Sequence, residues 1–211
     1  MADRAVAEAG ADAERGVDAE PGTDAKPGTD AKPGTDAKAL AELRAMAHPL
    51  RLRILSLLTG SALTAAEVAR ELDITHANAS YHLRQLLAVG VVEIAGEERI
   101  RGGTAKRYRY KLDRDLNLAG RPRTDPEAWA ARQRFYAALA DELRRRARRI
   151  ASTPNRTHAT DAELWIDPAV WDELKSTVDA VSDRLHRAAL PPRTPGTILV
   201  SATYVMFEMQ A

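Results

Sequence analysis

Two short helical patterns joined by a tight turn constrain this chain more than any other feature of its sequence. Thr64 and Glu67 have the spacing of a capping box, and they predict a helix over residues 65–72. Thr75 then caps a second helix, which the apolar spacing extends over residues 76–89. Two helices of this length on either side of such a short turn form a helix-turn-helix pattern.

The flanking residues extend this pattern into a larger domain. Apolar residues at helical spacing predict one helix near residues 40–46 and another from Pro49 to Gly60. After the second helix of the motif, the apolar period changes to that of strands, over residues 91–101 and 105–112. The last three of these helices and the hairpin that follows them have the order typical of a winged helix-turn-helix, which we place at residues 39–113.

The second helix of the motif has the composition of a base-reading helix. Asn78 and Gln85 suit bidentate contacts to adenine, while Ser80 and Arg84 suit phosphates. The full set of candidate DNA-binding residues on this helix is His76, Asn78, Ser80, Tyr81, His82, Arg84 and Gln85. The plainer alternative is a solvated polar face, and His82 in particular could instead pack at the rim of the core.

The hairpin supplies a second group of candidate DNA contacts. Arg99 and Arg101 precede its Gly-rich tip, and Lys106 and Arg107 follow it. Basic side chains on a wing can lie along a phosphate backbone. An edge hairpin protected by charges is the alternative interpretation, and it explains Arg109 and Lys111 equally well.

The runs AMAHPLRLRILSLL and LTAAEVARELDITHANASYHLRQLLAVGVVE resemble the ArsR-type winged helix-turn-helix regulators. The resemblance covers about residues 39–112. It implies DNA binding, a recognition helix at His76–Ala88, a wing at Glu93–Tyr110 and a homodimer. Many members of that family sense metals through cysteines, or through Asp and His residues on a later helix.

This chain departs from the metal-sensing members. It contains no cysteine, and its predicted helix over residues 126–151 contains no histidine. Asp183 and His186 are three residues apart on a predicted helix, but a stable metal site needs three or four ligands. We therefore expect no metal site and no cofactor.

The first 38 residues differ in character from the rest. They contain the hexapeptide PGTDAK three times in a row, no aromatic residue, and 5 basic against 9 acidic side chains, a net charge of −4. Such a segment cannot bury a core, so we expect a disordered tail, with a docking arm as the alternative. Residues 39–123 carry 14 basic and 9 acidic side chains, a net charge of +5, which suits a polyanionic partner.

We predict that residues 114–124 form a linker to a C-terminal region over residues 125–211. There we expect a long helix over residues 126–151, a short strand at 164–166, a helix from Pro168 and a final strand at 198–209. The fold class expected for the whole chain is mainly α with a small β component (α+β): a winged helix-turn-helix plus a helical or α+β extension.

The long helix is the expected dimer interface. Its apolar residues at helical spacing are Trp129, Phe135, Tyr136, Leu139 and Leu143. Ordinary packing within the chain is the alternative. An unknown small-molecule effector could bind among Trp165, Trp171, Tyr204, Phe207 and Met209, although plain core packing is the favoured interpretation of these residues.

Other functional classes find little support in the sequence. There is no Gly-rich phosphate loop, no nucleophile elbow and no cluster of metal ligands, so we do not expect an enzyme. No apolar run is long enough for a membrane span, which favours a cytoplasmic protein. We expect a sequence-specific transcription regulator, a homodimeric repressor on a palindromic DNA operator. The alternative is a winged-helix module that binds protein without reading DNA.

Overall fold

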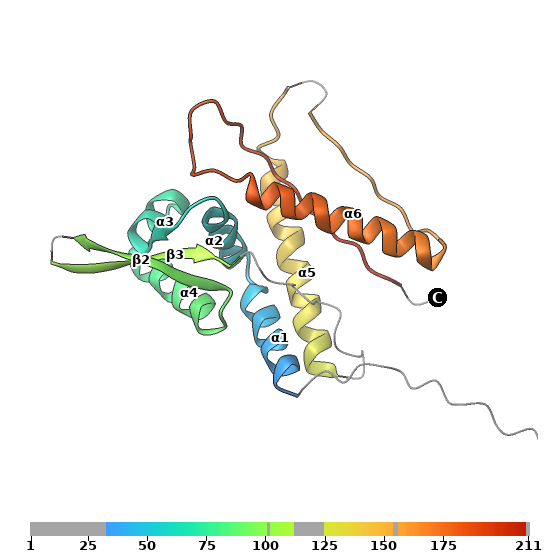
Figure 1. Cartoon of the computed structure of the whole chain (residues 1–211), viewed down its shortest axis with the longest axis horizontal. Helices are drawn as coiled ribbons and strands as arrows, with labels where there is room; N and C mark the ends of the chain where they lie inside the picture. Colours follow the sequence, from blue (N-terminus) through green and yellow to red (C-terminus); the bar gives the residue numbers. More distant parts are fainter. Residues whose placement is uncertain (1–32, 101, 112–124, 154–155, 210–211) are drawn as a thin grey trace, which may run out of the picture. The chain divides into compact units, whose positions relative to one another are not determined.

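The computed structural model describes residues 33–100, 102–111, 125–153 and 156–209, all within one unit that begins at Lys32. Side chains are described from Ala37 onward. The helices and strands follow the order shown in Figure 1: α1 Pro33–Met46, α2 Pro49–Thr59, β1 Leu63–Thr64, α3 Ala65–Leu72, α4 His76–Ala88, β2 Val92–Ile100, β3 Gly103–Tyr110, α5 Pro126–Ala147 and α6 Pro168–Arg187.

Helices α1 to α4 and the base of the sheet surround one hydrophobic core. Ile54 and Leu58 of α2 meet Val68 of α3 and Leu83 and Leu86 of α4, and each of these side chains is fully buried. Helix α5 adds Phe135 to the same core and packs against α1 and α2. Helices α1 and α2 therefore support the helix-turn-helix through this shared core.

The caps predicted from sequence are confirmed. The Thr64 hydroxyl accepts a hydrogen bond from the Glu67 backbone N–H, and the Glu67 carboxylate accepts one from the Thr64 N–H. The turn between α3 and α4 is made by Asp73 in the left-handed region, at φ 53°. Aspartate tolerates this conformation better than most residues do, so the chain reverses there without a glycine.

The sheet is three-stranded and antiparallel in the order β1-β3-β2. Tyr108 of β3 pairs with Leu63 on one side and with Ile94 on the other, and a register shift follows between Ile94 and Gly96. The long β2–β3 hairpin extends beyond α3 and α4 as a wing (Figure 1). Helices and a small sheet around a helix-turn-helix confirm the predicted α+β winged fold.

One boundary differs from the sequence-based prediction. Helix α1 begins at Pro33, within the third PGTDAK repeat, so the predicted tail over residues 1–38 ends too late. Proline fits the first turn of a helix because its missing N–H has no partner there. The linker predicted at residues 114–124 lies outside the described residues.

The C-terminal region is helical but forms no strand in its described part. Helix α6 begins at Pro168 with Asp167 as its cap, as predicted. The strands predicted at residues 164–166 and 198–209 are wrong, since both segments lie outside any helix or strand. An apolar alternating pattern favours a strand, but a strand also needs a partner to accept its hydrogen bonds. Among the described helices, none is long and apolar enough to cross a membrane.

Candidate nucleic-acid interface

Helix α4 presents one face to the core and the other to solvent. Ala79, Leu83 and Leu86 are fully buried, whereas Asn78 and Gln85 are exposed on the opposite side. Tyr81 lies between them on the helix surface and is 51% exposed. The exposed face therefore carries planar polar side chains, whose donors and acceptors suit the edges of bases.

The N-terminus of α4 is held by a side-chain cap. The Thr75 hydroxyl accepts a hydrogen bond from the Asn78 N–H at 3.2 Å, and His76 at the first position is exposed. Free backbone N–H groups at a helix start attract anions such as phosphate. Ser80 is half-buried and Arg84 is exposed, and their four-residue spacing places both on one side of the polar face as candidate phosphate contacts.

His82 lies in the core rather than on the exposed face. Its side chain is only 6% exposed, and its ring centroid is 4.9 Å from that of His48, the residue that caps α2. The His48 Nδ1 accepts a hydrogen bond from the Leu50 N–H. Burial, and then the charge of Arg51, lower the pKa of His48, and the pKa of His82 is lowered by burial, His48 and Arg51.

The placement of His82 therefore fits the alternative interpretation, in which it packs at the rim of the core. Sequence analysis missed its partner, His48. The signal available was the position of His48 directly before Pro49, at a predicted helix start, where a side-chain acceptor is favoured. Nothing in the sequence pattern links these two distant histidines.

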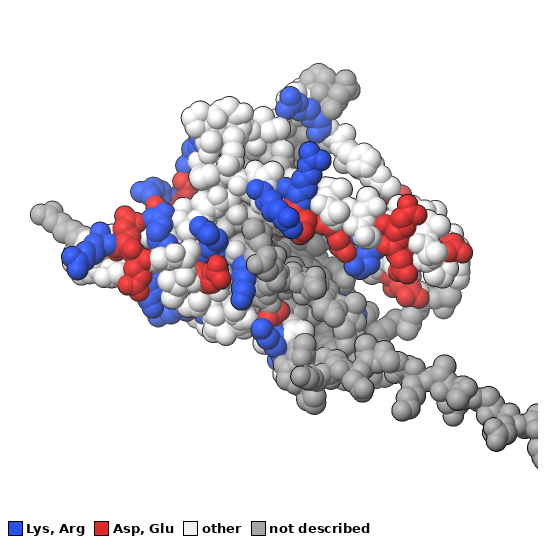
Figure 2. Space-filling model, in the orientation of Figure 1, with Lys and Arg blue, Asp and Glu red and all other residues white. Residues whose placement is uncertain are grey.

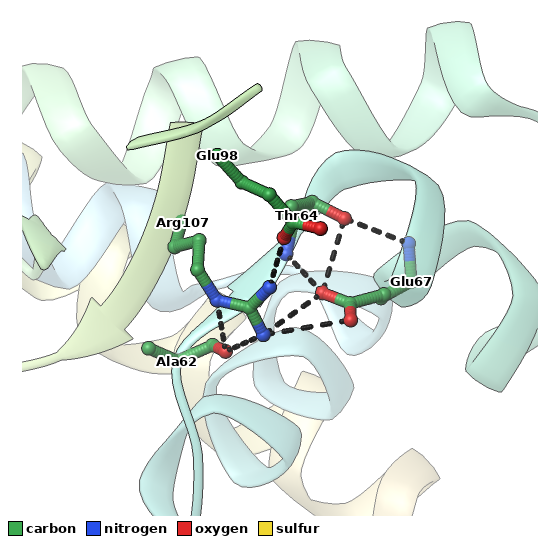
Figure 3. A network of polar contacts seen from close by, with 5 residues as sticks. All are labelled: Ala62, Thr64, Glu67, Glu98 and Arg107. Atoms are coloured by element: carbon green, nitrogen blue, oxygen red, sulfur yellow. Dashed lines mark hydrogen bonds and ion pairs between the residues drawn. The ribbon is translucent and has the colours of Figure 1, made fainter. Parts of the chain in front are cut away.

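On the wing, Arg107 is held inside a polar network (Figure 3). Its guanidinium donates to the Ala62 carbonyl at 2.7 and 3.2 Å and pairs with Glu67 at 3.3 Å and with Glu98 of β2. Glu67 also accepts from both the N–H and the hydroxyl of Thr64. One side chain thus joins β3 and β2 to the capping box of α3.

This network also explains the protonation state of Glu67. Burial alone would raise the pKa of its carboxyl, but the hydrogen bonds from Thr64 and the proximity of Arg107 hold that pKa below its usual value. Glu67 is therefore a carboxylate, and Arg107 has an anionic partner within the chain. Figure 3 shows that the guanidinium of Arg107 points toward α3.

The basic wing residues lie on two faces of the hairpin. The register opposes Glu97 to Lys106 and Arg99 to Thr104, which places Arg99 and Lys106 on one face. Arg107 belongs to the other face. Arg99 and Lys106 are exposed, and Arg101 lies outside the described residues. Basic and acidic side chains alternate over the hairpin in Figure 2, so the wing carries no continuous basic surface on the face shown.

A comparison with protein-family models places this geometry in a known class. Residues 46–95 match the model described as a helix-turn-helix domain. These residues form a helix-turn-helix domain. The match begins at the end of α1 and includes α2, β1, α3, α4 and the start of β2. A search of curated proteins found no match.

Outside the helix-turn-helix domain, the predicted interface residues of α5 divide into two groups. Phe135 is buried in the core of its own chain, and Trp129, Tyr136 and Leu139 are partly buried. Leu143 is 51% exposed. The packing of α5 against α1 and α2 therefore uses much of the apolar face on which the dimer prediction depends.

Most of the residues considered for an effector site are exposed. Trp165 is 90% exposed, and Tyr204, Phe207 and Met209 are each at least half exposed. The expectation that they form plain core is therefore wrong, since none of them is buried. In the described part of the chain, no three His, Asp or Glu side chains gather as a metal site would require.

Proposed function

We propose that the chain is a sequence-specific transcription regulator, a homodimeric repressor of the ArsR type that reads a palindromic operator with α4. A helix-turn-helix domain implies a double-stranded DNA partner, because its second helix fits the major groove. The observation that carries the proposal is the exposed face of α4, where Asn78, Tyr81 and Gln85 stand together without a lysine or glutamate. Such a face offers both donors and acceptors to bases.

The proposal divides the candidate residues by role. Asn78, Tyr81 and Gln85 read bases, and His76, Ser80 and Arg84 bind or approach phosphates beside them. Arg99, Arg101 and Lys106 bind the backbone through the wing. Arg107 acts mainly as a positioning residue, since its guanidinium is already bonded to Ala62, Glu67 and Glu98.

The direct test is equilibrium binding of the full chain to DNA from upstream of its own gene, with a shuffled duplex of equal length as control. Fluorescence anisotropy should show tighter binding to the native fragment. With about three to five basic contacts per subunit, the slope of log affinity against log salt should be roughly −5 to −9 for a dimer.

Equal affinity for the two duplexes would remove sequence-specific reading from the proposal. Absence of binding even at low salt would instead favour the alternative, a winged-helix module that binds protein. A slope near zero would contradict phosphate contacts by the wing and by α4.

A further inference from the structure

The last turn of α6 and the loop after it contact the helix-turn-helix domain and the end of β3. We call this segment, residues 186–197, the strap. Its contacts join residues that are far apart in the sequence. The contacting pairs are His186 with Tyr110 of β3, the Leu190 backbone with Gly60 at the end of α2, and Arg193 with Glu71 of α3.

The contact at Gly60 is a close approach of two backbones. A Cβ at position 60 would overlap the Leu190 carbonyl oxygen and would lie 2.9 Å from the carbonyl carbon. Gly60 itself has φ −89° and ψ −10°, a conformation that most residues can adopt. The end of α2 therefore needs glycine because of the strap that lies against it, and not because of its own backbone.

The strap is held in shape by its own turns. The Thr194 N–H and hydroxyl both donate to the Pro191 carbonyl, at 3.2 and 2.7 Å, and Thr197 donates to the Thr194 carbonyl in the same way. Within the first turn, Arg193 lies in the left-handed region at φ 64°, which is unfavourable for a residue with a Cβ. Such a conformation persists where the surrounding structure enforces it, and here it accompanies the ion pair with Glu71.

Two glutamates one turn apart tie α3 to different parts of the molecule. Glu67 pairs with Arg107 of the wing, and Glu71 pairs with Arg193 of the strap at 2.6 Å. The Glu71 side chain is only 19% exposed, so its carboxylate is largely withdrawn from water and the loss of its partner is costly. The buried side of α3 packs on α4 in the shared core. The strap therefore contacts the helix that supports both the wing and α4.

The contacts of the strap are weak one by one. The Arg193 side chain is 77% exposed, and the Leu190 side chain is 58% exposed although its backbone is in contact. An ion pair as exposed as this one changes an equilibrium by about fivefold at most. A segment held in this way can detach while the core stays folded, and moving elements are drawn from such low-stability segments.

We propose that the strap is a regulatory element that braces α3. While it is docked, it holds α3 and, through α3, keeps α4 in the position that reads DNA. Its displacement loosens α3 and lowers operator affinity. The consequence for DNA rests on the proposed function, whereas the bracing of α3 does not.

Hydrogen exchange of the full chain tests the bracing without DNA. Gly60→Ala should displace the strap, so backbone amides of residues 69–72 in α3 should exchange at least about fivefold faster than in the wild type. Arg193→Ala should act in the same direction, by up to about fivefold. Arg187→Ala is the matched control and should change nothing in α3, because Arg187 makes its 2.6 Å ion pair with Asp183 of α6 and is 75% exposed.

A double-mutant cycle tests whether Arg193 acts through Glu71. In a Glu71→Ala background, Arg193→Ala should not change exchange in α3 any further, because the ion pair is already lost. An equal effect of Arg193→Ala in both backgrounds would overturn the assignment of this contact. Unchanged exchange in α3 of both Gly60→Ala and Arg193→Ala would overturn the bracing itself.

Operator binding by the same variants tests the consequence for DNA. Gly60→Ala should weaken operator binding by about fivefold or more, the lower end of a typical coupling between two sites, and Arg187→Ala should bind as the wild type does. Faster exchange in α3 with unchanged operator affinity would overturn the coupling to α4. A wild-type chain that reads no operator would contradict the proposed function instead, and exchange would still decide whether the strap braces α3.

Discussion

At the scale of single residues, Arg107 shows how a basic side chain on a wing can serve the fold. The sequence pattern groups it with Arg99, Arg101 and Lys106 as a phosphate contact. That grouping stays a prediction, but the guanidinium already has three partners inside the chain: Ala62, Glu67 and Glu98. Periodicity along one strand indicates the face of a side chain and not which distant carboxylate will meet it.

Replacing Arg107 with alanine should therefore destabilise the domain. Loss of the guanidinium leaves the Ala62 carbonyl without this donor and removes the cation beside Glu67, which should lower the free energy of unfolding by about 1–3 kcal/mol. Urea unfolding followed by far-UV circular dichroism measures this change. Arg109→Ala is the matched control on the same strand, because Arg109 is exposed, and its effect should stay within about 0.5 kcal/mol. Equal stability of the two variants would show that the network contributes nothing.

At the scale of elements, helices and strands were predicted correctly where local sequence signals agreed. The prediction failed where a strand needed a neighbouring strand. The caps at Thr64 and Thr75 correctly predicted the starts of α3 and α4. The change in the spacing of apolar residues correctly predicted the hairpin. The segment over residues 198–209 has an equally clear strand pattern and is not a strand. A helix satisfies its own backbone hydrogen bonds, whereas a strand depends on a neighbour that its sequence does not reveal.

In the candidate site, too, the sequence predicts the local features and misses a long-range contact. The exposed positions of Asn78, Tyr81 and Gln85 follow from helical spacing, since Ala79, Leu83 and Leu86 mark the buried side. The contact of His48 with His82 does not follow from spacing, because it joins α2 to α4 across the core. Long-range contacts of this kind need the folded arrangement of both helices.

This histidine contact between α2 and α4 predicts a dependence of stability on pH. The pKa of both His48 and His82 is lowered below the usual value of 6.5, so below that pH the unfolded chain binds protons that the folded chain does not. The contribution of the neutral pair is therefore fully present above pH 6.5 and is lost as pH falls through and below that value.

Chemical denaturation at a series of pH values tests this dependence. His48→Asn keeps a side-chain acceptor at the cap of α2 and removes one titrating group. The variant should lose less unfolding free energy between pH 7.5 and pH 5.5 than the wild type does. Identical losses in the two proteins would show that the histidine pair does not titrate on unfolding.

At the scale of the whole molecule, the chain combines a helix-turn-helix domain at residues 46–95 with a C-terminal region that exposes an apolar surface. Two-fold symmetry connects these features in the proposed function, because a symmetric dimer presents two copies of α4 to the two halves of a palindrome. The proposed function assigns base reading to α4.

The central claim is that the exposed face of α4 reads DNA sequence. The most direct measurement compares Asn78→Ala and Gln85→Ala with Gln133→Ala, an exposed glutamine on α5, on the native operator fragment and on a shuffled duplex. Each α4 variant should lose about 1–3 kcal/mol on the operator and much less on the shuffled duplex, while Gln133→Ala should bind both duplexes as the wild type does. If the α4 variants kept full operator affinity, or weakened equally on both duplexes, α4 would not be the reading element and the account would be contradicted.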